Sequence, residues 1–319
     1  MPFPISGGVV CAGNIVYDIL VRPVDATQWG TTIWVESIEP HLGGNGANSS
    51  FALAKLGVPV RLAGMVGRDS FGDHLAGMLS AVGVDISFVA RGTQPTATSV
   101  GLVHSNGARQ FLHRPGCSHE VFLTPLVFNL EFIGSASHFH LANIFGIPGM
   151  RPLAALNLRA AHDAGLTTSL DTGWDARGEW MKLLADCLPN VDLLFVNEDE
   201  SRILSGSADA CDAAKFFQSH GVKNVVVKLG GQGSHVFTAA DNVKAHAFLV
   251  PAVDTTGTGD CFAGAFLAGL YHGFSTVESA RLANAVGALN IQRLGSTNGL
   301  LSFEETIAWM KTNQDPVEE

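Results

Sequence analysis

The sequence predicts an α/β fold of the doubly wound class, in which helices cover both faces of a largely parallel sheet. Short apolar runs alternate with segments whose apolar residues recur at helical spacing, an order typical of parallel strands joined by crossover helices. Two stretches rich in β-branched and aromatic residues interrupt this order, and they predict strands outside the main sheet.

Six apolar runs are the expected strands of the main sheet: VVCAG at 9–13, VRLAGMVG at 60–67, ASHFHLA at 136–142, TTSLD at 167–171, DLLFVN at 192–197 and NVVVKLG at 224–230. Helices are expected between them, at 45–56, 71–82, 149–164, 177–188 and 208–219. In the first of these segments, Phe51, Leu53, Ala54 and Leu56 provide the apolar face.

The two interrupting stretches lie at about 16–42 and 97–114, and Asn106-Gly107 supplies a hairpin turn in the second. We expect them to form a small sheet that covers a substrate or pairs with a second copy of the chain. The alternative is that they extend the main sheet. With 319 residues, the chain fits a single large α/β domain over 1–319 that carries this small sheet.

The composition indicates a globular protein, with 46% hydrophobic and 15% charged residues. The formal charge of −10 has no compensating basic run, which argues against a nucleic-acid partner. The five scattered cysteines include no C-x-x-C pair, and no apolar run reaches membrane-spanning length. No signal peptide is recognisable at the N-terminus, so we expect a cytoplasmic protein without a membrane partner.

A first glycine-rich segment, Gly43-Gly44-Asn45-Gly46-Ala47-Asn48, follows a strand-like run and precedes a helix-like run. Glycine lets a ligand approach the backbone closely, and Asn48 offers amide donors and an acceptor. The segment resembles the dinucleotide fingerprint, but Ser49 stands at the third glycine, so a dehydrogenase is weakly indicated. The simplest alternative is a helix-capping turn.

A second segment, DTTGTGDCFAGA at 254–265, runs directly into an apolar helix and is more specific. Gly257 and Gly259 allow backbone amides to converge at a helix N-terminus, where a phosphate or an oxyanion is stabilised. Asp260 would lie at the mouth of this anion hole and could accept a proton from an attacking hydroxyl. A helix-capping role for Asp260 would explain the carboxylate but not the glycines around it.

The two segments together resemble the signatures of the ribokinase-like (PfkB) carbohydrate kinases. GGNGANSSFALAKLGVPVRLAGMVGRDSFGDHLAGML is similar to the N-terminal signature of that family, and DTTGTGDCFAGAFLAGL is similar to its C-terminal signature. The resemblance runs from about Val9 to the helix after Ser302. It implies a three-layer α/β/α sandwich with a β-sheet lid, ATP as phosphoryl donor, Mg²⁺ as metal and a homodimer formed through the lid.

The resemblance also implies roles for individual residues. Those expected to bind the acceptor are Asp18, Gly43, Gly44 and Asn48. Asp260 matches the catalytic base, and the amides of Gly257, Thr258 and Gly259 match the anion hole for the transferred phosphoryl group. Asn197 and Glu200 fit the N-x-x-E motif that organises nucleotide phosphates, with Glu200 holding Mg²⁺ through water. An ordinary acidic helix start would also explain these two residues.

For the nucleotide, the resemblance implies Lys228, Gly230 and Gly233 in K-L-G-G-Q-G, with lysine where threonine is usual. This lysine either meets a phosphate as a point charge or points to solvent. Asn284 matches a position near the adenine, although it could serve only packing. Asp254 and Thr256, with the backbone near Gly295, resemble a monovalent-cation loop, so K⁺ is a possible activator.

Three further groups of residues receive simpler interpretations. His138 and His140 share a strand face but lack a third metal ligand, so packing or hydrogen bonding is favoured. Arg114 needs no special role, although it could contact substrate. Asp171-Thr172-Gly173-Trp174-Asp175 departs from the D-P-N-x-R of relatives, which leaves the acceptor open.

The expected activity is transfer of the γ-phosphoryl group of ATP to a hydroxyl of a sugar or sugar-like molecule. No arginine cluster near the N-terminal signature announces a second phosphate, which favours a free sugar. The alternatives are a nucleoside kinase, a phosphosugar kinase, and a non-catalytic ligand-binding regulator on the same fold. The intact Asp260 and its flanking glycines speak against the regulator.

Overall fold

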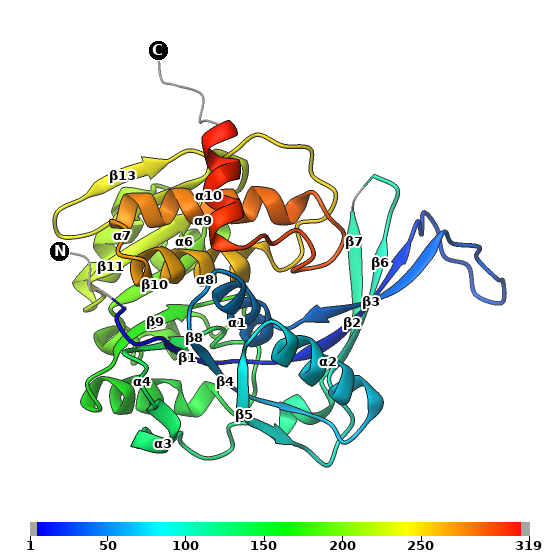
Figure 1. The fold of residues 1–319 in the computed structure, drawn as a ribbon, viewed down its shortest axis with the longest axis horizontal. Coiled ribbons are helices and arrows are strands. Elements are labelled where there is room, and N and C mark those ends of the chain that lie inside the picture. Colours follow the sequence, from blue (N-terminus) through cyan, green and yellow to red (C-terminus); the bar gives the residue numbers. More distant parts are fainter. Residues whose placement is uncertain (1–4, 107, 314–319) are drawn as a thin grey trace.

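The computed structural model describes residues 5–106 and 108–313, and it places a large and a small sheet beside each other (Figure 1). Within these residues, nine strands form the large sheet in the order β13-β12-β11-β10-β9-β8-β1-β4-β5. The pairs from β11 through β5 are parallel, whereas β12 and β13 are antiparallel. The fold is therefore the expected largely parallel α/β sandwich.

The strands of the large sheet are short. Their bounds are β1 Val9–Ala12, β4 Val60–Val66, β5 Asp85–Arg91, β8 His138–Leu141, β9 Thr167–Asp171, β10 Leu193–Asn197, β11 Asn224–Lys228, β12 Ser234–Phe237 and β13 Asn242–Ala245. All six expected strands are present, and β5, β12 and β13 were not anticipated.

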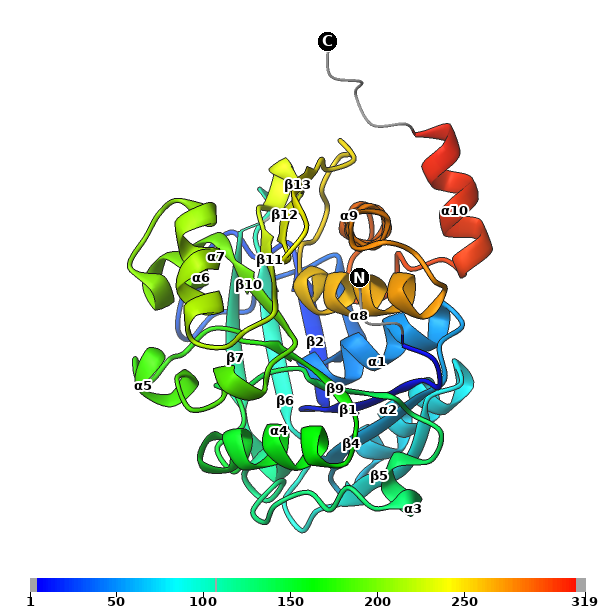
Figure 2. The same cartoon turned by 90° about the vertical axis from the view of Figure 1, so that its left-hand side faces the viewer.

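Helices cover both faces of this sheet (Figure 2). One face packs against α1 Asn45–Lys55, α2 Ser70–Ala81, α8 Thr258–Tyr271 and α9 Thr276–Ile291, and α10 Phe303–Thr312 packs on α9. The other face packs against α3 Leu130–Ile133, α4 Ala154–Asp163, α5 Met181–Leu184, α6 Glu198–Ser205 and α7 Ala210–Ser219. Alternation along β1 divides the core: Val9 and Cys11 pack on the first face, Val10 and Ala12 on the second.

Four short 3₁₀ turns complete the description: η1 Gly116–His119, η2 Arg151–Leu153, η3 Leu188–Asn190 and η4 Gly230–Gln232. The helix expected at 177–188 is largely absent, since only α5 and part of η3 fall within it. The backbone amides of Arg177, Glu179 and Trp180 donate instead to the Asp175 carboxylate, and Trp180 has a φ of 41°. A side-chain acceptor thus replaces the helical hydrogen bonds.

The small sheet contains β2 Val16–Arg22, β3 Ser37–Gly43, β6 Thr98–Val103 and β7 Arg109–Arg114, in the order β3-β2-β6-β7. The two interrupting stretches therefore form a separate sheet and do not extend the main one. Asn106, the first residue of the expected hairpin turn, lies between β6 and β7, and Gly107 lies outside the described residues.

The helices of this fold begin in two different ways. Capping boxes begin α9 with Ser275 and Glu278, and α10 with Ser302 and Glu305. In contrast, α1 and α8 begin after Gly44 and Gly257, and neither has a side-chain cap. In α1, Asn14 replaces the missing cap, since its side chain and its carbonyl accept from the amides of Asn45 and Ala47. Among the described residues, the first-turn amides of α8 have no such acceptor and are open to other partners.

The pairing register of β9, β10 and β11 brings polar residues together at the carboxyl ends of these three neighbouring strands. Phe195 of β10 pairs with Asp171 of β9, and Asn197 of β10 pairs with Lys228 of β11. In an open α/β sheet, ligands bind outside the carboxyl ends of the strands. The sheet itself thus places these side chains where a site is expected.

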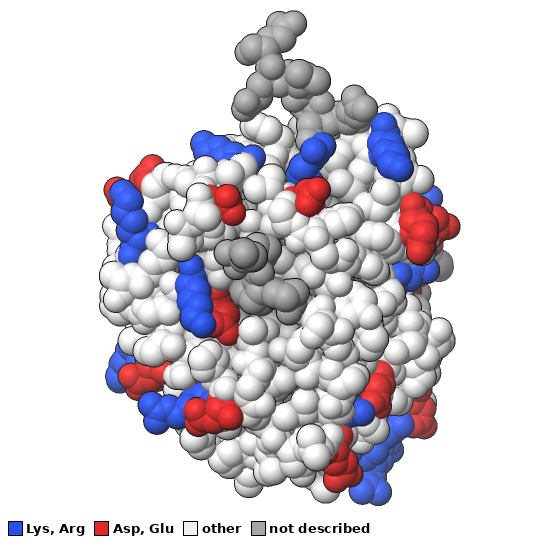
Figure 3. Space-filling model, turned by 60° about the vertical axis from the view of Figure 1, so that its left-hand side comes forward, with Lys and Arg blue, Asp and Glu red and all other residues white. Residues whose placement is uncertain are grey.

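On the surface shown in Figure 3, acidic and basic side chains are interspersed, and neither sign forms a continuous patch. The five cysteines all lie in the described part of the chain and are unpaired. Across residues 5–106 and 108–313, no helix combines the length and apolar character needed to cross a membrane.

Candidate active site

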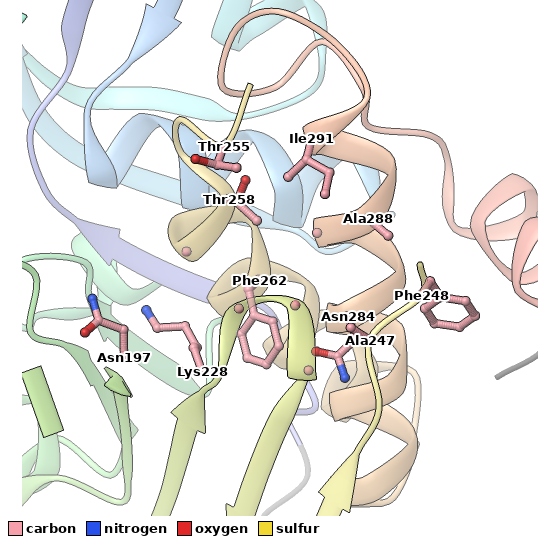
Figure 4. A pocket seen from close by; sticks show the side chains of 15 residues that line it. Asn197, Lys228, Ala247, Phe248, Thr255, Thr258, Phe262, Asn284, Ala288 and Ile291 are labelled. Atoms are coloured by element: carbon pink, nitrogen blue, oxygen red, sulfur yellow. The ribbon is translucent and has the colours of Figure 1, made fainter. Parts of the chain in front are cut away.

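A cavity of about 360 Å³ lies between the carboxyl ends of β10 and β11 and the helices α8 and α9 (Figure 4). Asn197 and Lys228 lie at one end of it, and Phe248 lies at the other. The residues from the expected nucleotide site and anion hole that line it are Asn197, Lys228, Gly230, Gly233, Thr258, Gly259 and Asn284. Segments far apart in the sequence thus form one hollow next to the start of α8.

Lys228 does not point to solvent, which rules out one of its two expected placements. Its Nζ donates to Oδ1 and Oδ2 of Asp171 at 3.0 and 2.8 Å. A Cβ on Gly259 would lie 3.3 Å from the same Nζ. Burial lowers the pKa of Lys228, but Asp171 and Glu200 more than offset this effect, so the lysine remains a cation beside α8.

The amides at the start of α8 form the second component. Gly257 is the N-cap, with a φ of 67° that favours glycine. No hydrogen bond joins the amides of Gly257 and Gly259 to another described residue, and Thr258 N reaches only Thr255 O at 3.4 Å. These donors, the positive end of the helix and Lys228 together can bind an anion.

Asp260 follows in the first turn of α8 and is buried. Asn45 Nδ2 donates to its Oδ1 at 2.6 Å, and Asn48 Nδ2 donates to its Oδ2 at 2.9 Å. Burial raises the pKa of Asp260, while these two hydrogen bonds and the charge of Lys228 oppose the rise. The result is a fixed carboxylate next to an anion-binding helix start.

On the other side of Asp260, a network of side chains continues from α1. Asn143, just after β8, donates to Asn45 Oδ1 at 2.8 Å and accepts from the amides of Phe145 and Gly146. Ser296 Oγ donates to Asn48 Oδ1 at 2.9 Å. The two asparagines that hold Asp260 are therefore themselves held in place.

Asp18 lies on β2 of the small sheet, close to the glycine pair at 43–44. A Cβ on Gly43 would be 2.1 Å from Oδ2 of Asp18, and a Cβ on Gly44 would be 2.5 Å from the Asn14 carbonyl oxygen. Both positions therefore require glycine. Burial raises the pKa of Asp18 to about 6, and the Ser99 hydroxyl opposes this rise.

Asn197 and Glu200 form the capping box of α6: Asn197 Oδ1 accepts from Glu200 N at 2.8 Å, and Asn197 N donates to Glu200 Oε2 at 3.0 Å. Thr172 Oγ1 also donates to Glu200 Oε2, at 2.9 Å. Within the described residues, Glu200 Oε1 has no hydrogen-bond partner. No group of three or more His, Cys, Asp or Glu side chains in the described part of the chain could hold a metal ion.

The remaining predicted residues have definite partners. Asn284 Nδ2 donates to the carbonyls of Ala245 and His246 at 2.8 and 3.1 Å while the residue lines the cavity. Asp254 and Thr256 contact Arg109 of the small sheet. His138 and His140 are hydrogen-bonded to Ser169 inside the large sheet, in agreement with their simpler interpretation.

Sequence reasoning missed four contributors: Asn45, Asn143, Asp171 as the partner of Lys228, and Arg109. Asn45 stood inside the first glycine-rich segment, between residues that did receive roles. Asn143 and Asp171 each end or follow a predicted parallel strand, and that position is itself a signal of a ligand-facing residue. No comparable signal marks Arg109.

Three comparisons place this architecture among known proteins. The model of the pfkB family of carbohydrate kinases matches residues 9–302. "Probable fructokinase-4" of Arabidopsis thaliana is 31% identical over 292 residues, which cover 85% of this chain and 88% of that protein. Arabidopsis thaliana ribokinase, solved with ribose and ATP, is 26% identical with a TM-score of 0.82, over 96% of this chain and 99% of that one.

Ribokinase from Thermotoga maritima is similar to the same extent, with 26% identity and a TM-score of 0.80 over 97% of this chain and 100% of that one. The family resemblance expected from the two glycine-rich segments is therefore confirmed. The chain belongs to the pfkB family of carbohydrate kinases.

Proposed function

We propose that this protein transfers the γ-phosphoryl group of ATP to a hydroxyl group of a free sugar, with Asp260 as the general base. One observation carries the proposal. Asp260 stands where the anion-binding start of α8 meets the side-chain network of α1. A hydroxyl placed there would have a proton acceptor on one side and a phosphoryl-binding site on the other.

Asp260 accepts the proton of the attacking hydroxyl in this mechanism. Its pKa lies above the ordinary value, which makes it a stronger base than an exposed aspartate. Asn45 and Asn48 fix both carboxylate oxygens and thereby set the direction from which a hydroxyl is accepted. Asn48, expected to bind the acceptor, is buried with both ends of its amide engaged, so we propose that it positions the base beside the sugar.

The donor side holds ATP in the cavity of Figure 4. The amides of Gly257, Thr258 and Gly259 stabilise the charge on the transferred phosphoryl group, and Lys228 adds a point charge there. The Arabidopsis ribokinase structure contains ATP, which supports this assignment of the cavity. Gly230, Gly233 and Asn284 then lie where the nucleoside part of ATP is bound.

Mg²⁺ fits the donor side through Glu200. This residue is buried, and its Oε1 has no partner among the described residues, so that oxygen can accept from a water bound to the metal. When bound with the nucleotide, Mg²⁺ neutralises charge on the phosphate oxygens. At Asp254 and Thr256, where K⁺ was expected, both side chains contact the guanidinium of Arg109.

On the acceptor side, Asp18 binds sugar hydroxyls, and the glycine pair at 43–44 lets the sugar approach the backbone. The relative named as a probable fructokinase makes fructose the first acceptor to test. Ribose follows, because the ribokinase structure holds it. Nucleosides, phosphosugars and a purely binding role are less favoured, since the relatives named above are a fructokinase and two ribokinases.

We further propose that residues 1–319 act as one kinase domain, with the small sheet as a lid over the acceptor. Ile38 and Leu112 on this sheet are 64% and 57% exposed, and Trp29 and Trp34 in the β2–β3 connection are almost fully exposed. Such apolar surface supports a homodimer formed through the lid. The unpaired cysteines agree with a cytoplasmic location.

The experiment that tests the function is a coupled ADP-release screen with ATP and Mg²⁺ over fructose, other hexoses, pentoses, nucleosides and phosphosugars. We expect fructose or another free sugar to give the highest kcat/KM. Highest turnover with a nucleoside or a phosphosugar would overturn the acceptor class, and no turnover with any acceptor would overturn the kinase assignment.

Light scattering of wild type and of Leu112→Glu would test the dimer, which the substitution should dissociate.

A further inference from the structure

The loop at 254–256 leads directly into the anion-binding start of α8, and Asp254 organises it. Asp254 Oδ1 accepts from Thr256 N at 2.9 Å and from Thr256 Oγ1 at 2.7 Å, while Oδ2 accepts from Gly295 N at 2.8 Å. The residue is only 3% exposed. A carboxylate this deeply buried is stabilised by hydrogen bonds and by a nearby positive charge.

Arg109, at the start of β7 in the small sheet, supplies a positive charge at this loop. Its Nη1 donates to Asp254 Oδ1 and, at 2.6 Å, to Thr256 Oγ1. Its Nη2 donates to Thr255 Oγ1. Arg109 therefore contacts three consecutive residues with one rigid fork, a geometry that lysine cannot reproduce.

These contacts leave no suitable place for a monovalent cation on the side chains expected to hold one. Both carboxylate oxygens of Asp254 and the hydroxyl of Thr256 are already engaged. A cation at Asp254 Oδ1 or Thr256 Oγ1 would also lie against the guanidinium, and the two like charges would repel. Burial alone would raise the pKa of Asp254, but hydrogen bonds from Thr256 and Gly295 and the charge of Arg109 hold it below its ordinary value.

The contacts of Arg109 lie next to the cavity and to the start of α8. Thr255 lines the cavity, and its carbonyl oxygen accepts from the Thr258 amide at 3.4 Å. The guanidinium therefore binds the side chains of the three residues that lead into the anion-hole amides of Gly257, Thr258 and Gly259. Because Arg109 belongs to the small sheet, the same contact fixes that sheet to the phosphoryl end of the site.

We propose that Arg109 takes the place of a monovalent cation at the 254–256 loop and positions the anion-hole amides of α8. The activity of the wild-type protein is then independent of K⁺, whereas a chain without Arg109 acquires a dependence on K⁺. The catalytic part of this inference rests on the proposed kinase function. The structural part, that Arg109 orders the 254–256 loop, concerns the nucleotide-free protein and does not depend on that function.

The test compares wild type, Arg109→Ala and Arg22→Ala, each in KCl and in tetramethylammonium chloride. Arg22→Ala is the matched control, since it removes an arginine from β2 of the same sheet without touching the loop. We expect equal kcat for wild type in the two salts. For Arg109→Ala in tetramethylammonium, loss of a charge-assisted contact should lower kcat roughly tenfold, with partial recovery in KCl.

Hydrogen exchange of the amides at 255–260 in the nucleotide-free protein supplies a readout besides activity. Arg109→Ala should accelerate this exchange, KCl should slow it again, and wild type should show no effect of KCl. Arg109→Lys keeps a charge but cannot reach all three residues, so its amide exchange should be faster than in wild type and slower than in Arg109→Ala. If Arg109→Ala does not fold, Arg109→Lys replaces it in both measurements.

Activation of wild type by K⁺, or protection of its 255–260 amides by K⁺, would overturn the proposal. So would an Arg109→Ala protein with unchanged kcat and unchanged exchange. If no acceptor is phosphorylated at all, the proposed function fails, and the exchange data still decide whether Arg109 orders the loop.

Discussion

The two sides of Asp260 are built from different chemistry. The cavity on the donor side is lined by glycines, by apolar residues of α8 and α9 and by backbone amides, and Lys228 is the one charged side chain among the described residues that line it. The acceptor side consists of polar side chains: Asn45 and Asn48 hold Asp260, Asn143 holds Asn45, and the buried Asp18 lies beside the glycine pair at 43–44. A backbone-lined donor site suits a nucleotide shared by a whole family, whereas side chains select the individual acceptor.

If the two sides meet at Asp260, removing its basicity should abolish transfer without disturbing the donor side. Asp260→Asn keeps the shape and the helix position but loses the proton acceptor. We expect kcat to fall by roughly 10²–10⁴-fold. ATP affinity, measured by calorimetry, should persist because the amides of Gly257, Thr258 and Gly259 remain. Turnover within a few-fold of wild type would show that Asp260 is not the base.

The donor side should be sensitive to loss of the positive charge of Lys228. Lys228→Gln removes the charge beside Gly259, and we expect kcat/KM for ATP to fall by about 10- to 100-fold. It also leaves Asp171 buried without its partner, which lowers the melting temperature.

The double variant Lys228→Gln, Asp171→Asn should recover the melting temperature but not the activity. Lys311→Gln, on exposed α10, is the matched control and should behave as wild type in both measurements. Recovery of activity in the double variant would mean that Lys228 only neutralises Asp171.

A substitution on the acceptor side should change sugar binding without changing ATP binding. Asp18→Asn weakens hydroxyl binding but leaves the cavity intact, so we expect KM for the sugar to rise about tenfold and KM for ATP to stay within twofold. Steady-state kinetics with both substrates varied will measure this. Equal changes in the two KM values would show that the two sides are not independent.

The same substitution should stabilise the protein near neutral pH. Burial raises the pKa of Asp18 from 3.8 to about 6, so the folded state binds this proton more tightly than the unfolded state. Its contribution to stability is present below pH 3.8 and is lost as the pH rises through about 6. The cost of the charged form above that pH is on the order of 3 kcal/mol.

We therefore expect a higher melting temperature for Asp18→Asn at pH 7.5, by roughly 2 °C or more. The difference should vanish near pH 4, where wild-type Asp18 is protonated as well. Scanning calorimetry across this range checks the prediction. A melting temperature unchanged or lowered at pH 7.5 would contradict the raised pKa of Asp18.

The difference between backbone-built and side-chain-built parts of the site also explains which features the sequence could predict. The start of α8 was predictable because its geometry demands glycine: a Cβ on Gly257 would lie 2.4 Å from the Ser296 Cβ. Such local requirements leave a motif in the chain. The parallel strands were predictable from their apolar runs, and the family resemblance followed from the two glycine-rich segments.

Side-chain partnerships between distant segments left no such motif. Lys228 meets a carboxylate 57 residues away, and Arg109 meets Asp254 across 145 residues, so neither contact can be inferred from local pattern. The orientation of Lys228 was accordingly left open by the sequence. The expected helix at 177–188 failed for a related reason, because the Asp175 side chain captured the amides of that segment.

The most direct test of the central claim follows the phosphoryl group itself. ATP labelled in its γ-phosphoryl group is incubated with Mg²⁺, fructose and wild-type or Asp260→Asn protein, and the products are analysed by mass spectrometry. The account predicts labelled fructose phosphate in equal amount to ADP with wild type, and loss of both products with Asp260→Asn. ADP and labelled inorganic phosphate from wild type, without labelled sugar phosphate from fructose or from any other acceptor of the screen, would contradict it.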